Sequence, residues 1–380
     1  MTRTWDIFCS VVDNYGDIGV CWRLARQLSS ELKQSVRLWV DDLASFQHLC
    51  AGIDPGLTVQ FVEAVEVRRW SVPFNVVGPA DVVIEGFGVR LPDVYINAMA
   101  ARQPRPVWIN LEYLSAEKWV EGCHGLPSPH PGVPLVKYFF FPGFTPATGG
   151  LLMESGLAQA RDSFQGNPEA VAAYRRSLGL VLPEADALWI SLFCYDNAAL
   201  PALMEAWISE TMPVICVATA GAALTQLSRI AGRQISAGSR VDLGSLSIQA
   251  IPFLELDRYD RLLWACDVNF VRGEDSFIRA QLAARPLIWQ AYPQEEGTHV
   301  QKASAFLERY TSALSANIGV PYRALMQAWN RESAEVGEAW VALRPHRAAL
   351  AFYARDWAGQ LARGGNLAFT LAEFCEDRLE

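Results

Sequence analysis

Apolar runs of strand length alternate with helical patterns along this chain, and the alternation occurs twice. In the first half, the runs rich in Val, Ile, Phe and Trp lie at residues 6–12, 36–40, 82–88 and 107–113. Between them, residues 20–28 and 92–101 repeat apolar side chains at helical spacing. Strands that alternate with helices form a parallel sheet, because each connection crosses one face of it. The first half is therefore predicted to be a doubly wound α/β domain.

The same rhythm restarts after a segment rich in Pro, Gly and Ser at 122–150. Strand-like runs then lie at residues 187–195, 213–219, 246–253, 267–271 and 286–290. From about residue 299 the pattern is almost entirely helical, with a last helix at 366–379. We predict two Rossmann-like domains that face each other across a cleft, at 1–150 and 151–363. A C-terminal helix at 364–380 is expected to pack back on the first domain.

Charge and hydropathy exclude several classes of protein. Lys and Arg number 32 and Asp and Glu 41, a net charge of −9, which argues against binding nucleic acid through phosphates or a membrane surface through basic residues. No apolar stretch reaches about 18 residues and the N-terminal apolar run lacks a cleavage-site pattern, so we expect a cytoplasmic protein. Eight cysteines without a CxxC pair predict buried, reduced thiols, and five histidines without HxH or HExxH predict no metal site.

The first candidate site is the segment 13–19, Asp-Asn-Tyr-Gly-Asp-Ile-Gly, between the first strand and the first helix. A doubly wound sheet presents its ligands there. Gly16 and Gly19 permit a tight turn, and the carboxylate of Asp13 or Asp17 can act as a general base. A second interpretation stays open, since Asp is also a favoured helix cap. The segment lacks both GxGxxG and a Gly-Lys-Ser/Thr ending, which argues against a dinucleotide fingerprint or a P-loop.

The second candidate site joins a strand to a helix at residues 271–281, Val-Arg-Gly-Glu-Asp-Ser-Phe-Ile-Arg-Ala-Gln. Asp275 or Ser276 is expected to cap that helix, whose first N–H groups form an anion site. Arg272, just before it, is placed for a bidentate contact with phosphate. Glu274 and Asp275 can accept hydrogen bonds from sugar hydroxyls. This pattern predicts a diphosphate site, although a capped helix with a surface Arg–Glu pair also fits it.

Aromatic residues gather at the ends of the strands predicted in the second half. Phe193 and Tyr195 end one strand, Phe253 ends another, and Tyr259 follows. Such rings can stack on a nucleobase, or they can simply belong to the core. In the next strand-to-helix loop, at 292–299, the sequence offers Gln294 and Glu295 to sugar hydroxyls, or the loop is merely solvated.

Two segments of the chain closely resemble one protein family. They are residues 5–28, Trp-Asp-Ile-Phe-Cys-Ser-Val-Val-Asp-Asn-Tyr-Gly-Asp-Ile-Gly-Val-Cys-Trp-Arg-Leu-Ala-Arg-Gln-Leu, and the segment that begins Arg-Gly-Glu-Asp-Ser-Phe at 272. Both are similar to the EarP family of protein-arginine rhamnosyltransferases, which modify bacterial translation elongation factor P. The resemblance covers nearly the full length. It implies a GT-B fold, TDP-β-L-rhamnose as co-substrate, elongation factor P as protein substrate, inversion at the anomeric carbon and no metal or other cofactor.

The resemblance also implies roles for individual residues. Asp17 corresponds to the general base and Asp13 to its essential companion, and Glu274 joins them as a catalytic residue. The nucleoside is implied to lie on Phe193, Tyr195, Phe253 and Tyr259. The diphosphate and sugar are implied to contact Arg272, Glu274, Asp275 and Ser276. The loop between donor and acceptor is implied to include Asn14, Tyr15, Gly16 and Gly19. The chain departs from the family at Leu256, where members have Gln, and at Tyr259, where they have Phe.

Arginine is a difficult nucleophile, because its guanidinium stays charged and its lone pairs are delocalised. A pair of carboxylates can hold its N–H groups, align one nitrogen behind the anomeric carbon and accept a proton. A cation and a helix N-terminus can stabilise the leaving diphosphate. The residues alone leave three alternatives open: a GT-B enzyme with a different acceptor, a nucleotide-sugar epimerase, and a nucleotide-binding protein without catalysis.

Overall fold

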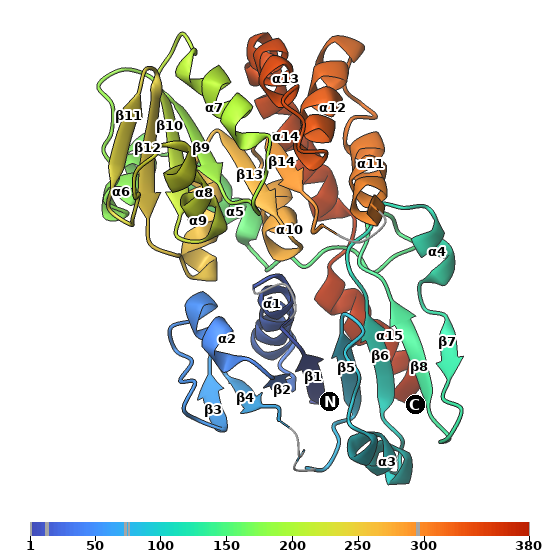
Figure 1. Cartoon of the computed structure of the whole chain (residues 1–380). Helices are drawn as coiled ribbons and strands as arrows, with labels where there is room; N and C mark the ends of the chain where they lie inside the picture. The colour runs from blue at the N-terminus through green and yellow to red at the C-terminus, as the bar shows by residue number, and fades with distance from the viewer. Residues whose placement is uncertain (1, 12–14, 72–73, 75–76, 294–296, 380) are drawn as a thin grey trace. The chain divides into compact units, whose positions relative to one another are not determined.

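The computed structural model describes residues 2–11, 15–71, 74, 77–293 and 297–379 (Figure 1). Its contacts divide the chain into two compact units. Unit 1 comprises residues 1–155 and 361–380, and unit 2 comprises residues 156–360. The segment 151–155 is bound to unit 1, because the side-chain amide of Gln27 donates to the carbonyl of Met153 at 2.8 Å.

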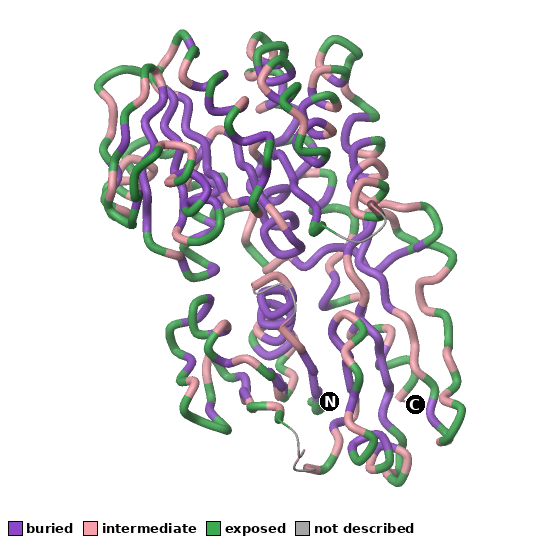
Figure 2. Tube along the Cα trace, in the orientation of Figure 1, coloured by how far each residue is buried: buried purple, intermediate pink, exposed green. Residues whose placement is uncertain are grey.

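Within the described residues, unit 1 contains one eight-stranded sheet in the order β3-β4-β2-β1-β5-β6-β8-β7. Neighbouring strands are parallel except at the edge pairs β3–β4 and β7–β8. The strands are β1 (Thr4–Cys9), β2 (Ser35–Val40), β3 (Val59–Val62), β4 (Val65–Arg69), β5 (Val82–Gly86), β6 (Val107–Leu111), β7 (Pro127–Pro129) and β8 (Val136–Phe140). In Figure 2 the central strands β1, β5 and β6 are almost entirely buried, as expected for a sheet covered on both faces.

Helices cover both faces of this sheet. They are α1 (Gly16–Ser30), α2 (Leu43–Leu49), α3 (Asp93–Ala101), α4 (Trp119–Cys123) and α15 (Leu367–Leu379). Phe8 points toward α3 and contacts Tyr95 at 4.9 Å between ring centres. Gly86 lies against α1, where an added Cβ would come within 2.8 Å of the Cys21 sulfur. The C-terminal helix α15 packs on β8 and β6, and its Phe374 ring lies 5.4 Å from that of Phe140.

Unit 2 repeats the same plan in a six-stranded sheet, in the order β11-β12-β10-β9-β13-β14. Among its described strand pairs, β11–β12 alone is antiparallel. The strands are β9 (Leu188–Leu192), β10 (Val214–Thr219), β11 (Arg240–Leu243), β12 (Leu246–Ile251), β13 (Val268–Arg272) and β14 (Leu287–Gln290). The helices are α5 (Leu157–Gln165), α6 (Pro168–Ser177), α7 (Leu200–Ile208), α8 (Ala222–Ile230), α9 (Leu256–Ala265), α10 (Asp275–Leu282), α11 (Thr298–Tyr310), α12 (Ala316–Asn330), α13 (Val336–Leu343), the 3₁₀ turn Arg344–His346 and α14 (Arg347–Arg363).

The structure differs from the sequence-based prediction mainly at edges and strand ends. The hairpin β3–β4, the pair β7–β8 and the strand β11 were not predicted, since half-exposed strands near a sheet edge lack the continuous apolar run of a buried strand. Five predicted strands were too long at their carboxyl ends, at β1, β5, β6, β9 and β12. β9 ends at Leu192 and β12 at Ile251, so Phe193, Tyr195 and Phe253 follow their strands instead of ending them. That shift moves these rings from the sheet into loops.

Two composition-based expectations bear on the fold. All eight cysteines are free, and all but Cys123 are buried, as predicted for reduced thiols in a core. Across the described residues, no helix combines the length and apolar character needed to cross a bilayer.

Candidate functional site

Each sheet has a point where the strand order reverses. In unit 1 the chain runs from β1 outward to β2 and β4, then returns to β5 on the other side of β1. In unit 2 it runs from β9 to β10 and β12, then returns to β13. Open α/β sheets bind ligands at such switch points, beyond the carboxyl ends of the two strands. The predicted site residues follow these strands.

In unit 2, the structure brings the aromatic residues and Arg272 together. The Phe193 ring lies 5.5 Å from the ring of Tyr259 and 6.4 Å from that of Phe253. The guanidinium carbon of Arg272 lies 4.5 Å from the centre of the Phe193 ring and 4.3 Å from that of Tyr195. The cluster therefore combines flat apolar faces with one cation beside them.

Hydrogen bonds from the start of α10 fix the backbone of Arg272. The Arg272 N–H donates to the Ser276 hydroxyl oxygen at 3.1 Å, and the same hydroxyl donates to the Arg272 carbonyl. Gly273 has φ 62°, a conformation that favours glycine. Its carbonyl accepts a hydrogen bond from the Trp289 indole at 2.9 Å.

The predicted cap of α10 was wrong. Glu274 occupies the N-cap position and makes no side-chain cap hydrogen bond, while Asp275 and Ser276 lie inside the helix. Ser276 cannot cap α10 because its hydroxyl is used by the backbone of Arg272. Among the described residues no side chain therefore caps the start of α10, and its first N–H groups suit an anionic ligand.

Acidic side chains surround this helix start. Glu274 and Asp275 are each 6% exposed, and the Lys302 ammonium lies 3.5 Å from a Glu274 carboxylate oxygen. Burial raises the pKa of the Tyr259 hydroxyl well above its ordinary value, and the Asp275 charge adds to that shift. In the described part of the chain, the Tyr259 hydroxyl oxygen has no hydrogen-bond partner. An ion pair between Arg279 of α10 and Asp260 of α9, with 2.7 Å between Nη2 and Oδ2, joins the two helices.

In unit 1, Asp17 lies in the first turn of α1 and is only 2% exposed. Tyr15, not Asp17, occupies the N-cap position, so the structure rejects the capping interpretation for Asp17. The predicted turn at Gly16 and Gly19 was also wrong, since both residues are helical and the Gly19 N–H donates to the Tyr15 carbonyl at 3.0 Å. Burial of Ile18 among the core residues favours helix there despite the glycines.

Tyr113 is a residue of this site that the sequence analysis did not single out. Its hydroxyl donates to the Asp17 carboxylate at 3.1 Å. Its ring stacks on Phe87, with 4.4 Å between ring centres. Phe87 directly follows β5 and has φ 60°. Phe87 and Tyr113 each lie just beyond the carboxyl end of a strand, β5 and β6. This position in the sequence could have identified both residues as candidates.

Several predicted residues cannot be placed. Asp13, Asn14, Gln294 and Glu295 lie outside the described residues. The structure describes the other candidates and places them at or after strand ends, in α9, or at the N-cap and in the first turn of α1 and α10.

Two doubly wound sheets, each with candidate residues at its switch point, are the architecture of GT-B glycosyltransferases. A solved glycosyltransferase from Rickettsia africae ESF-5 has the same fold: the match covers 99% of this chain and 97% of that chain, with a TM-score of 0.55 at 10% identity. More specifically, the chain belongs to the family "Elongation-Factor P (EF-P) rhamnosyltransferase EarP", which matches residues 5–376. These findings confirm the predicted fold class and the resemblance.

Individual relatives agree with the family. The chain is 47% identical over 380 residues to a protein-arginine rhamnosyltransferase of Pseudomonas putida KT2440, with 100% of both chains covered. It also matches a structure solved for EarP-mediated arginine glycosylation of translation elongation factor EF-P, with 35% identity, a TM-score of 0.72 and 99% of each chain covered.

Proposed function

We propose that this protein-arginine rhamnosyltransferase of elongation factor P takes L-rhamnose from TDP-β-L-rhamnose and transfers it with inversion at the anomeric carbon. Family membership supports the reaction and the acceptor. The observation that carries the donor assignment is Arg272, which lies against two aromatic rings directly before the uncapped start of α10. Because its substrate is a translation factor, we propose that the enzyme works in the cytoplasm.

The donor binds to unit 2 in this proposal. The thymidine moiety stacks within the cluster of Phe193, Tyr195, Phe253 and Tyr259, whose rings provide apolar faces. The diphosphate takes a bidentate contact from Arg272 and hydrogen bonds from the first N–H groups of α10. The rhamnose hydroxyls donate to the carboxylates of Glu274 and Asp275.

The general base in this proposal is a residue of unit 1. The acceptor guanidinium must lose a proton as it becomes a nucleophile, because its pKa lies above about 12 in water. Asp17 is the proposed base and Asp13 its companion. Asp17 is 2% exposed, so water competes little with the acceptor guanidinium for its carboxylate oxygens. Tyr113 serves as a positioning residue, since its hydroxyl donates to one oxygen of Asp17 and its ring is held by Phe87.

One displacement completes the reaction. A guanidinium nitrogen forms a bond to the anomeric carbon while the bond from that carbon to the diphosphate oxygen breaks. The electron pair of the broken bond leaves with TDP, and the nitrogen's proton moves to Asp17. Arg272 and the start of α10 stabilise the charge on the leaving diphosphate, which needs no metal ion for this purpose. Glu274, paired with Lys302, holds the sugar so that the anomeric carbon stays in line.

Intact-mass analysis of elongation factor P tests the proposal. The factor is incubated with the enzyme and TDP-rhamnose, and the expected product carries one added rhamnosyl group. The same factor with the target arginine changed to lysine should remain unmodified. If TDP-rhamnose is consumed equally fast without elongation factor P, the acceptor assignment is wrong.

A further inference from the structure

Phe87 has a backbone conformation that an aromatic residue rarely adopts. It directly follows β5, and its φ of 60° lies in the left-handed region. The next residue, Gly88, has φ 73°, and the Val89 N–H donates to the Gly86 carbonyl at 3.4 Å. A four-residue turn with positive φ at both central positions favours Asn or Gly there. Phe87 is therefore strained, and Asn or Gly would form this turn at a lower cost.

In this conformation the Phe87 ring stacks on the ring of Tyr113. The ring centres are 4.4 Å apart and the planes differ by 17°. Both residues are half-buried. The Phe87 N–H also donates to the Leu111 carbonyl at 2.7 Å, which ties the turn to the end of β6. The strained turn and the stack thus join the segments that follow β5 and β6.

Tyr113 connects this stack to Asp17. Its hydroxyl donates to the Asp17 carboxylate at 3.1 Å, and Asp17 is 2% exposed. A catalytic group must be held within about 0.5 Å of its productive position, by neighbours that are themselves fixed by packing. Phe87 covers one face of the Tyr113 ring and so limits the movement of the ring that carries this hydroxyl.

We propose that Phe87 is a positioning residue, whose ring holds Tyr113 so that the Tyr113 hydroxyl keeps the Asp17 carboxylate in place. The inference rests on the proposed role of Asp17 as the base. Among the six described non-glycine residues with positive φ, Phe87 alone is aromatic. Strained backbone persists where the surrounding structure demands it, and such places cluster at active sites. The contact with Tyr113 is what a smaller turn residue would lose.

Three substitutions separate the ring from the strain. Phe87→Tyr keeps both, Phe87→Ala removes the ring alone, and Phe87→Gly removes the ring and the strain. By intact-mass analysis of elongation factor P, kcat should fall about tenfold in the Ala and Gly variants and stay within about twofold in the Tyr variant. KM for TDP-rhamnose should stay constant in all three. Phe87→Gly should melt at a higher temperature than Phe87→Ala, because glycine adopts positive φ without strain.

A double-mutant cycle tests whether Phe87 acts through Tyr113. Phe87→Gly combined with Tyr113→Phe should be no slower than Tyr113→Phe alone, because the hydroxyl that Phe87 positions is already absent. The kcat of the double variant should therefore lie about tenfold below that of the unaltered protein. Two independent structural effects would instead multiply to about a hundredfold.

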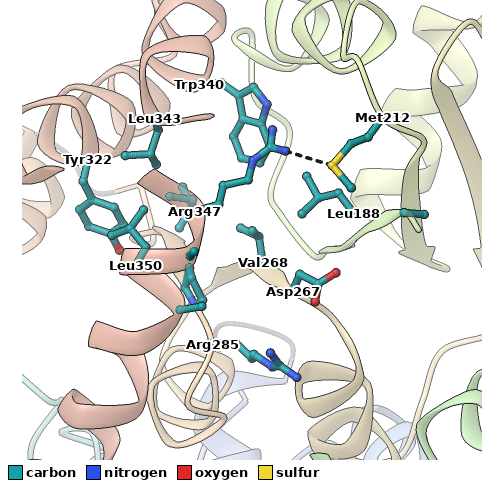
Figure 3. Close-up of a pocket in the computed structure, with 15 residues that line it drawn as sticks. Leu188, Met212, Asp267, Val268, Arg285, Tyr322, Trp340, Leu343, Arg347 and Leu350 are labelled. Carbon is teal, nitrogen blue, oxygen red and sulfur yellow. Dashed lines mark hydrogen bonds between the residues drawn. The ribbon is translucent and has the colours of Figure 1, made fainter. Parts of the chain in front are cut away.

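Two controls measure effects unrelated to the site. Lys33 is exposed and has φ 56°, so Lys33→Gly relieves a similar strain and should leave kcat intact. Leu350 is 2% exposed and lines a cavity of about 330 Å³ in unit 2, at the amino ends of β9, β13 and β14 (Figure 3). Leu350→Ala should lower the melting temperature by loss of buried apolar contacts and leave kcat intact, since the proposed donor residues follow the opposite ends of these strands.

The inference is overturned if Phe87→Ala and Phe87→Gly keep the full kcat, or if Phe87→Tyr loses as much as they do. It is also overturned if the double variant is a further tenfold slower than Tyr113→Phe. Asp17→Asn in the same assay separates this inference from the proposed function. An active Asp17→Asn removes the base and with it the role of Phe87, whereas an inactive Asp17→Asn beside a fully active Phe87→Gly removes the role of Phe87 alone.

Discussion

The guanidinium carbon of Arg272 lies 4.3 Å from the centre of the Tyr195 ring. Arg272 ends β13 and Tyr195 follows β9, so the contact joins the two strands at the switch point of the unit 2 sheet. A cation on an aromatic face gains about 0.5–2 kcal/mol and is oriented by it. The side chain that we assign to the diphosphate is therefore ordered before the ligand arrives, which lowers the entropic cost of binding.

Replacing Arg272 should weaken the donor complex. Arg272→Ala is expected to lower the affinity for TDP by about ten- to a hundredfold, because a charge-assisted hydrogen bond contributes roughly 1.5–3 kcal/mol. Calorimetric titration with TDP measures the change, and Arg331→Ala, at an exposed arginine of unit 2, is the control. An unchanged affinity would remove the proposed diphosphate site.

Asp17→Asn should abolish transfer without affecting donor binding. The substitution keeps the size of the side chain and removes the proton acceptor, so the rate of rhamnose addition should fall about 10²–10⁴-fold. The TDP affinity should stay the same, since the nucleotide contacts belong to unit 2. Asp42→Asn is a matched control: Asp42 caps α2 through its side chain, and Asn caps equally well. A normal rate in Asp17→Asn would exclude Asp17 as the base.

Tyr113→Phe tests whether the hydroxyl on Asp17 positions the base. The ring can still stack on Phe87, but the 3.1 Å hydrogen bond is lost. We expect kcat to fall about tenfold, as for a hydrogen bond to a charged group, and KM for TDP-rhamnose to stay constant. A purely structural role predicts instead a lower melting temperature with kcat intact, and that pattern would contradict our assignment.

Tyr259→Phe should stabilise the protein. The Tyr259 hydroxyl is buried without a hydrogen-bond partner among the described residues, and such a group costs roughly 1–3 kcal/mol. The free energy of unfolding in urea should therefore rise by about 1 kcal/mol. Tyr322→Phe provides the opposite case, because that hydroxyl donates to the Leu287 carbonyl, and it should destabilise by a similar amount. If Tyr259→Phe lowers stability, its hydroxyl has a partner after all.

Chelation should leave the reaction intact. In the proposed step, Arg272 and the start of α10 stabilise the leaving diphosphate. In other enzymes that transfer glycosyl or phosphoryl groups, a divalent ion stabilises this charge. The rate of rhamnose addition should stay within about twofold in excess EDTA. Loss of activity that is restored by Mg²⁺ or Mn²⁺ would contradict this mechanism.

Much of the architecture was predictable because it depends on local pattern. Continuous apolar runs predicted the central parallel strands β1, β2, β5 and β6 of the first sheet and β9, β10, β12, β13 and β14 of the second. Their alternation with helices predicted the double winding. The segments around Asp17 and Arg272 could be singled out because strand-to-helix junctions present ligands. The edge hairpin β3–β4 escaped prediction, since its exposed residues dilute the apolar signal.

The sequence by itself therefore determined the two sheets, the family and the junctions that carry the candidate residues. Only the tertiary structure decided which of these residues touch. Tyr113 lies 96 positions from Asp17, and their hydrogen bond exists because β6 and the start of α1 meet at one end of a sheet. The stacking of Arg272 on Tyr195 and the cavity beside Leu350 arise in the same way. Side-chain periodicity is a local property of the chain, whereas contacts between distant residues depend on strand order and on how the helices pack.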